Sequence, residues 1–157
     1  MNVELIVVGK TDSKEVAALV EEYKGRIGFY TRFGITIIPD VKNTRSMSEQ
    51  QQKKSEGEAI LKLLQPSDYV TLLDERGMQP TSEEFADWMQ KRMASGCKRL
   101  VFIIGGPYGF SEEVYGRAAG KIALSKMTFS HQIVRAIFTE QLYRAFTIIN
   151  NEPYHHK

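Results

Sequence analysis

The chain has 157 residues, of which 42% are hydrophobic and 25% charged, and its formal net charge at pH 7 is +2. A chain of this length can fold as one domain, residues 1–157, and needs no disulfide or structural metal to bury a core. The mild charge neither requires nor excludes a nucleic-acid partner, and no apolar run is long enough to span a membrane.

The cysteine count bears on the cellular compartment. Cys97 is the single cysteine, so no intramolecular disulfide can form, and a reducing environment fits that count. The N-terminal residues lack the basic segment and long apolar run of a signal peptide. We therefore expect a cytoplasmic protein with no membrane partner.

Strand-like and helix-like segments alternate along the chain. Short apolar runs predict strands over residues 3–8, 35–38, 69–73, 100–104 and 121–124. Segments with helical spacing predict helices over residues 14–28, 48–64, 82–95, from 112 onward, and 131–149. Such alternation predicts an α/β fold, with a parallel sheet covered by helices on both faces.

Several connections have their own signals. Serines at positions 13, 48, 111 and 130 can cap the helices that follow them, and Gln51 completes a capping box with Ser48. The charged run from Asp74 to Gly77 reads as a tight turn after the third strand. The last helix is apolar over most of its circumference, which predicts burial against its own sheet and against a second copy of the chain.

The fourth predicted strand runs directly into a glycine-rich loop, Gly105-Gly106-Pro107-Tyr108-Gly109. Its spacing is neither that of a dinucleotide-binding loop nor that of a P-loop, so a simple turn and a ligand-binding loop are about equally favoured. A second polar loop, residues 125–129, follows the fifth strand. Because parallel strands end at one edge of a sheet, the two loops could form one pocket there.

Five motifs in order then point to one family. They are LLDERG, IIGGPYGFS, LSKMTFSHQIVR, EQLYRAF and NEPYHHK, and they extend over essentially the whole chain. Together they closely resemble the ribosomal RNA large-subunit methyltransferase H family of the SPOUT class. The resemblance implies a C-terminal trefoil knot, the α/β knot, and a homodimer with its active sites at the interface. It also implies methyl transfer from S-adenosylmethionine to N3 of a pseudouridine in large-subunit (23S) ribosomal RNA, on assembled ribosomes.

The resemblance also implies which residues act. Carried over by position, the cofactor-binding residues are Leu73, Gly105, Leu124, Ser125, Lys126, Met127, Thr128 and Phe129. The polar residues placed near the acceptor base are His131, Arg135, Arg144, Tyr154 and His155, of which all but Arg135 are predicted to be catalytic. Ser130 departs from the family pattern, since many members have proline there, and we expect little loss beyond rigidity.

The chemistry assigns roles to these residues. A sulfonium donor is already activated, so no metal is expected, and the protein must hold donor and acceptor in line. Arg144 is the candidate for stabilising the imide anion of the base, and His155 for removing its proton, although water could do so instead. Structural alternatives remain open: Arg144 could pair with Glu140, His131 could only begin a helix, and Tyr154 could only stack on the partner chain.

Other functions also remain open. A basic patch for RNA could form from residues of the C-terminal half, namely Lys91, Arg92, Lys98, Arg99, Arg117, Lys121, Lys126 and Arg135, or these could be ordinary surface residues. The competing hypotheses are a non-catalytic ribosome-binding assembly protein and an unknotted nucleotide- or flavin-binding α/β module.

Overall fold

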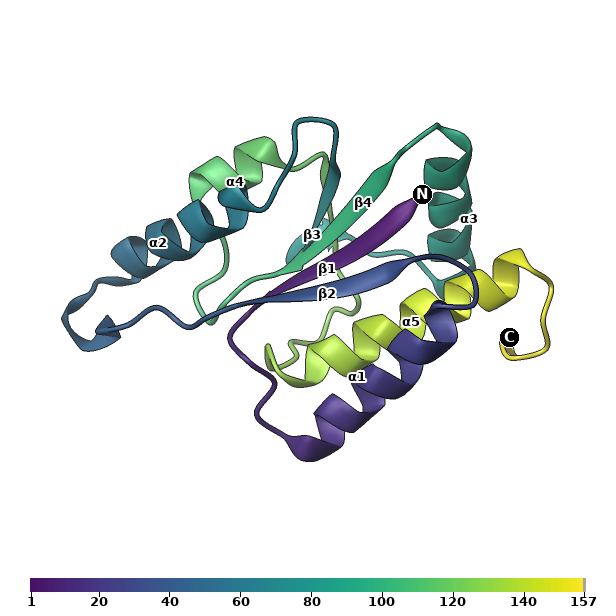
Figure 1. Ribbon diagram of the computed structural model, residues 1–157, viewed down its shortest axis with the longest axis horizontal. Helices are drawn as coiled ribbons and strands as arrows, with labels where there is room; N and C mark the ends of the chain where they lie inside the picture. The colour runs from purple at the N-terminus through teal and green to yellow at the C-terminus, as the bar shows by residue number, and fades with distance from the viewer. Residues whose placement is uncertain (157) are drawn as a thin grey trace.

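A five-stranded parallel sheet in the order β2-β1-β4-β3-β5 runs through the computed structural model, which describes residues 1–156 (Figure 1). The strands are β1 (Asn2–Val8), β2 (Phe33–Ile38), β3 (Tyr69–Met78), β4 (Arg99–Ile104) and β5 (Gly120–Ile122). β4 lies between β1 and β3, and its residues Leu100–Ile103 are fully buried. This is why its sequence is continuously apolar: both of its faces are covered.

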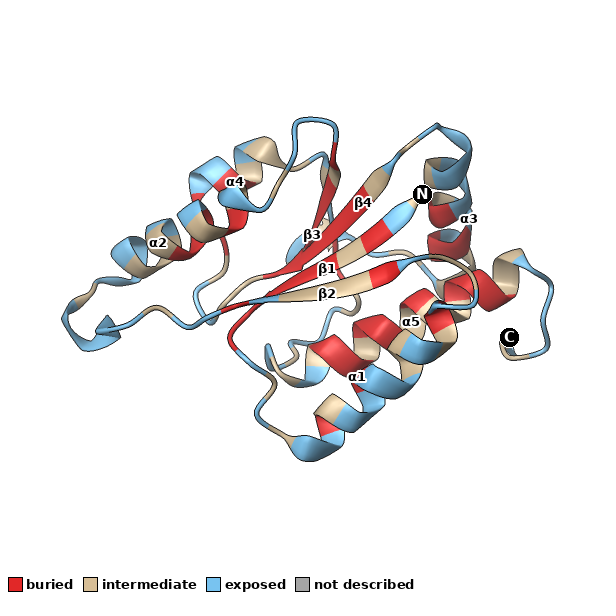
Figure 2. Cartoon of the chain, viewed as in Figure 1, coloured by how far each residue is buried: buried red, intermediate tan, exposed pale blue. Residues whose placement is uncertain are grey.

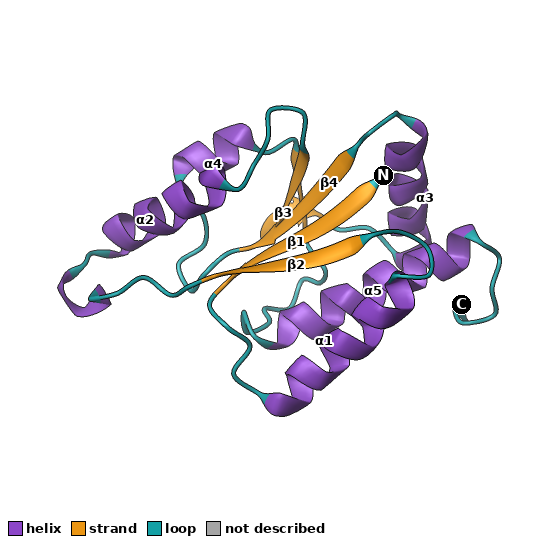
Figure 3. Ribbon diagram, viewed as in Figure 1, coloured by secondary structure: helices purple, strands orange, loops and turns teal. Residues whose placement is uncertain are grey.

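The helices cover both faces of this sheet (Figure 3). They are α1 (Lys14–Ile27), α2 (Glu49–Lys62), α3 (Ser82–Ala94), α4 (Glu112–Arg117) and α5 (Ile133–Ile149), with a 3-10 turn at Thr44–Ser46. One hydrophobic core joins the sheet to α1, α3 and α5, and a second joins it to α2 and α4. The parallel α/β architecture predicted from the sequence is confirmed.

Helix starts follow the predicted capping chemistry. The hydroxyls of Ser13, Ser48, Thr81 and Ser111 each accept a hydrogen bond from the backbone N–H three residues further on. The capping box of Ser48 and Gln51 is present, and Thr81 forms a second one with Glu84. These bonds satisfy backbone donors that a helix leaves free in its first turn.

α5 lies beside both α1 and α3 on one face of the sheet (Figure 2). Phe138, Leu142 and Phe146 on α5 are almost completely buried in the core beneath it. Neighbouring helices therefore explain much of its apolar circumference within a single chain. Its contact with a second copy of the chain stays a prediction.

The segment from Asp74 to Gly77 corrects the sequence interpretation, because it is a continuation of β3 and not a tight turn. Leu73 and Met78 both pair with Ile122 of the edge strand β5, so residues 74–77 form a bulge between these two pairs. A side chain at Gly77 would come within 2.5 Å of the backbone nitrogen of Ile122, so only glycine lets the strands approach here. Glu75 and Arg76 are exposed, which explains why this strand reads as polar.

Arg135 is a second correction. The resemblance places it near an acceptor base, but only 2% of it is exposed, and its guanidinium is held beneath the end of β1. Nη2 donates to the Val8 carbonyl oxygen (2.8 Å), Nη1 to the Gly9 carbonyl oxygen (2.7 Å) and to Thr11 Oγ1 (3.1 Å). Nε donates to the His131 carbonyl oxygen at 3.0 Å. Arg135 therefore fastens the start of α5 to the carboxyl end of β1.

We predict that Arg135→Ala lowers the free energy of unfolding by about 2–4 kcal/mol, because two buried carbonyls lose their donors. Arg135→Lys should recover part of this loss, since an ammonium can reach one carbonyl but not fork between two. Urea denaturation measures the effect, with the exposed Arg32→Ala as the control. A loss no larger than that of the control would show that these contacts do not hold the fold.

Candidate functional site

A cavity of about 490 Å³ lies at the carboxyl ends of β3, β4 and β5. Three chain segments line it: the end of β3, the glycine loop after β4, and the loop between β5 and α5. Of the predicted cofactor residues, the cavity brings together Leu73, Gly105, Leu124, Ser125, Met127, Thr128 and Phe129, whereas Lys126 is outside its lining. His131 lines the same cavity. A cavity of this size suits a ligand of cofactor dimensions.

The glycine loop is shaped by close contact with α2. A turn closes it, with the Gly109 N–H donating to the Gly106 carbonyl oxygen at 3.1 Å. A Cβ at Gly106 would lie 2.6 Å from Oε1 of Glu56, so a side chain here would force that carboxyl group to move. The loop backbone is therefore pressed against Glu56 on one side and lines the cavity.

Short polar contacts order the loop between β5 and α5. The hydroxyl of Ser125 accepts from the Met127 N–H at 3.0 Å, and that of Ser130 accepts from the Ile133 N–H at 3.1 Å. Gln132 ties the loop to residues 10–12, because its side chain bonds to the Lys10 carbonyl oxygen and to the Asp12 N–H. Met127 is 78% exposed at the rim. Ser130 therefore orders the turn that precedes α5, but it is not the helix cap that the sequence predicted. α5 begins at Ile133, and its N-cap residue, Gln132, makes no side-chain capping bond.

Glu56 is a buried carboxyl group that the sequence interpretation missed. Only 3% of it is exposed; Oε2 accepts from Gln52 Nε2 at 3.1 Å, and Oε1 has no hydrogen-bond partner among the described residues. Burial raises the pKa of Glu56, and Asp40 adds to this, while Gln52 and His131 oppose it. A signal was available, because Glu56 lies one helical turn from the buried Ile60 and so shares its inward face.

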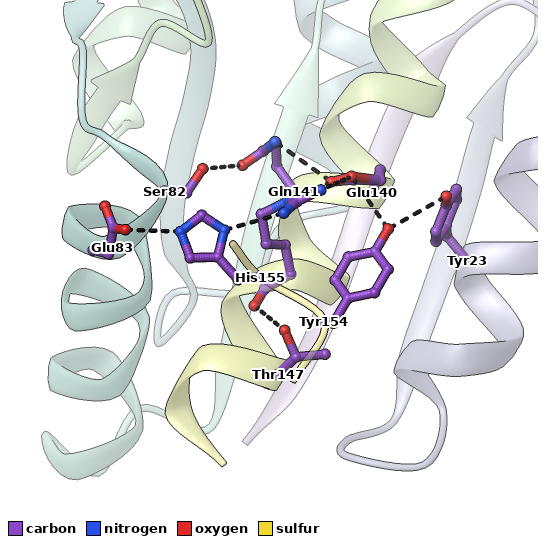
Figure 4. Close-up of polar contacts among 9 residues, drawn as sticks. Tyr23, Ser82, Glu83, Glu140, Gln141, Thr147, Tyr154 and His155 are labelled. Carbon is purple, nitrogen blue, oxygen red and sulfur yellow. Dashed lines mark hydrogen bonds and ion pairs between the residues drawn. The ribbon is translucent and has the colours of Figure 1, made fainter. Parts of the chain in front are cut away.

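Three of the predicted catalytic residues gather at the other end of α5 (Figure 4). Arg144 pairs with Glu140 through Nε (2.9 Å to Oε1) and Nη2 (3.0 Å to Oε2). Its Nη1 lies 3.0 Å from Nδ1 of His155, and its guanidinium lies over the ring of Tyr154. The hydrogen bonds to Glu140 raise the pKa of Arg144, which keeps it charged. Burial raises the pKa of Tyr154 most, with its bond to Tyr23 adding to the effect.

Within one chain, these residues are remote from the cavity. Arg144 lies eleven positions after Ile133 on α5, which is roughly 16–17 Å at 1.5 Å per residue. Among the described residues, the cavity lining includes His131 but not Arg144, Tyr154 or His155. The four predicted catalytic residues therefore form two groups, one beside the glycine loop and one beside the C-terminal tail.

Several residues of the expected basic patch have intramolecular partners. Arg99 pairs with Asp68 at 3.0 Å, Arg117 donates to the Gln65 carbonyl oxygen at 2.7 Å, and Arg92 lies over the rings of Tyr69 and Trp88. Together with the buried Arg135, these arginines have structural roles. The remaining residues of the expected patch are lysines, at positions 91, 98, 121 and 126.

The described residues contain neither a helix suited to span a membrane nor a cluster of metal ligands. No helix within residues 1–156 is long and apolar enough to cross a membrane. The same residues contain no cluster of three or more histidine, cysteine or acidic side chains arranged to hold a metal ion.

We predict that Glu56→Gln changes how stability depends on pH. The raised pKa means that folding favours the protonated carboxyl, so Glu56 makes the protein less stable as the pH rises from about 4 toward neutrality. Glutamine does not ionise, so the variant should not lose stability in this way. Its free energy of unfolding should exceed that of wild type by an amount that grows with pH, by at most about 1.4 kcal/mol per pH unit. Urea unfolding at a series of pH values measures it, with the exposed Glu58→Gln as the control. The prediction would be contradicted if the free energies of unfolding of Glu56→Gln and Glu58→Gln changed with pH in the same way.

Comparison with known proteins agrees with the resemblance seen in the motifs. A family model described as "Predicted SPOUT methyltransferase" matches residues 1–155. The chain is 60% identical to "Ribosomal RNA large subunit methyltransferase H" of Christiangramia forsetii and 57% identical to the protein of that name from Parabacteroides distasonis. That of Flavobacterium psychrophilum is 55% identical. Each match covers 100% of both chains. The chain therefore belongs to the SPOUT methyltransferase family.

Proposed function

We propose that this protein transfers a methyl group from S-adenosylmethionine to N3 of a pseudouridine in large-subunit (23S) ribosomal RNA, acting on assembled ribosomes in the cytoplasm. The observation that carries the proposal is the convergence of three loops on one cavity, in a chain whose full-length relatives bear the name of a ribosomal RNA methyltransferase.

The residues around the cavity fit a bound S-adenosylmethionine. The backbone approaches the cavity closely at Gly105 and Gly106, and the third loop is small and polar at Ser125 and Thr128. Backbone amides and carbonyls can recognise an adenine edge with no charged side chain. We propose that Leu73, Gly105 and residues 124–129 hold the cofactor, which when bound supplies an activated methyl group on a sulfonium.

The reaction also requires that the imide nitrogen of the base lose its proton. We assign stabilisation of the resulting anion to Arg144, because it is held charged by Glu140. We assign proton removal to His155, beside it, with water as the competing acceptor. Tyr154 would pack against the base, and His131 would contact it from the cavity side. Positioning of this kind can contribute roughly 7–11 kcal/mol toward the barrier.

The two separated groups of residues lead us to propose a homodimer. In one chain the helix length holds Arg144 away from the cavity, so one protomer alone cannot supply both groups to one substrate. A second copy, placed so that its C-terminal tail covers the cavity, would complete the site. We further propose that the C-terminal half forms the trefoil knot, which is compatible with β5 pairing beside β3 while α5 returns to pack on α1.

We predict that the purified protein transfers labelled methyl groups to ribosomal RNA in ribosomes that lack the modification. Arg144→Ala should lower the rate roughly 100-fold or more, with nearly unchanged affinity for S-adenosylmethionine by calorimetry. Arg32→Ala, on the exposed surface, serves as the control. Donor binding without any transfer by wild type would favour a non-catalytic assembly protein. Binding of a flavin in place of S-adenosylmethionine would favour an ordinary nucleotide-binding module.

A shared active site makes a second prediction. Gly106→Trp should abolish donor binding, because Gly106 lines the cavity and an indole side chain there has no room beside Glu56, while Arg144→Ala should bind donor without transferring the methyl. Each variant alone should be inactive. When the two are unfolded together and refolded, mixed dimers should recover about a quarter of the wild-type rate, since half of the dimers are mixed and each has one intact site. No recovery would show that each chain builds its site alone.

A further inference from the structure

We propose that Glu83 is a positioning residue for methyl transfer: it fixes His155 as the neutral tautomer with its proton on Nε2, so that Nδ1 holds the guanidinium of Arg144 in place. The inference rests on the proposed function for its consequence in catalysis, but the tautomer itself can be observed without any reaction.

The contacts form a chain across two helices and the C-terminal tail (Figure 4). Oε1 of Glu83, in the first turn of α3, lies 2.7 Å from Nε2 of His155. The opposite ring nitrogen, Nδ1, lies 3.0 Å from Nη1 of Arg144 on α5. Both histidine and arginine are partly buried, with side-chain exposures of 16% and 23%. The imidazole ring therefore bridges α3 and α5.

The donor and acceptor properties of the neighbours decide the tautomer. A guanidinium can only donate, so Nδ1 of His155 must accept and cannot carry a proton in this arrangement. An ionised carboxylate can only accept, so Nε2 must carry the proton that Glu83 receives. A doubly protonated ring would place an N–H on Nδ1 against the Arg144 donor. The arrangement thus selects one of the three states of the ring.

Arg144 is held on both sides as a result. Of its five N–H groups, two are taken by Glu140 and one by His155. One N–H remains on each terminal nitrogen for oxygens of a substrate. Because a guanidinium is planar, three fixed bonds define its orientation. Glu83 thereby acts on Arg144 through the intervening ring. Because both ring nitrogens are engaged, His155 can take the substrate proton only at Nδ1, after its bond to Arg144 opens.

Substitution of Glu83 should leave the fold intact. The capping box of α3 uses Thr81 and Glu84, and neither depends on Glu83. The contact between α3 and α5 also has its own hydrogen bond, from Ser82 Oγ to Gln141 Oε1 at 2.9 Å. Asp87 lies one turn further along the same helix and is exposed, so Asp87→Ala provides a matched control.

Long-range proton–nitrogen NMR of the full-length protein tests the tautomer directly. The sequence has three histidines, and His155→Asn assigns the signals of His155 by their loss. We expect wild-type His155 to be protonated on Nε2 near neutral pH. In Glu83→Ala the ring loses the contact that holds it against Arg144, so it can turn away and should show a mixture of ring states. Glu83→Gln should retain the wild-type state, since its amide oxygen also accepts. The Asp87→Ala spectrum should match wild type.

Methyl transfer provides the second readout. Glu83→Ala should lower kcat roughly 10- to 100-fold through misplacement of Arg144, with little change in donor affinity, and Glu83→Gln should restore most of it. A wild-type His155 protonated on Nδ1 or on both nitrogens, or one that Glu83→Ala leaves unchanged, would overturn the proposal. If the ring responds as expected but wild type transfers no methyl to ribosomal RNA, the positioning stands and the proposed function fails.

Discussion

The central strands β1 and β4 are buried on both faces over residues 5–8 and 100–104, and this constraint organises the rest of the molecule. Strands covered on both faces must be apolar throughout, and parallel neighbours must be joined by crossovers that carry helices. Every crossover then delivers a loop to the same edge of the sheet. The cavity is lined by the loops after β3, β4 and β5 because those strands end side by side there.

Two buried charged side chains lie near this edge of the sheet, and each contacts backbone there. The loop of Gly105 and Gly106 packs against the buried Glu56, and Arg135 joins α5 to the last carbonyls of β1. Both contacts position backbone, although neither side chain lines the cavity. At the far end of α5, by contrast, the polar chain from Glu83 through His155 to Arg144 positions a charge. Buried polar side chains therefore position the backbone at one end of α5 and a charged side chain at the other.

Much of this fold could be predicted from the sequence, because periodicity and capping residues reflect local physics. The bulge at Asp74–Gly77 within β3 could not, since charged residues and glycine are typical of turns. The strand continues beyond them only because Leu73 and Met78, on either side, both pair with β5. Arg135 was misplaced because a motif gives its position along α5 but not the direction in which it points. Glu83 left no signal, since its partner lies 72 residues away in the sequence.

The contact between Gly106 and Glu56 ties together two positions that lie on different elements. A larger residue at 106 needs either a displaced Glu56 carboxyl group or a smaller residue at 56. The two positions should therefore change together in evolution, because a smaller residue at 56 makes it easier to accommodate a side chain at 106. Alanine or serine at 106 should therefore be more frequent in sequences that have a smaller residue than glutamate at 56.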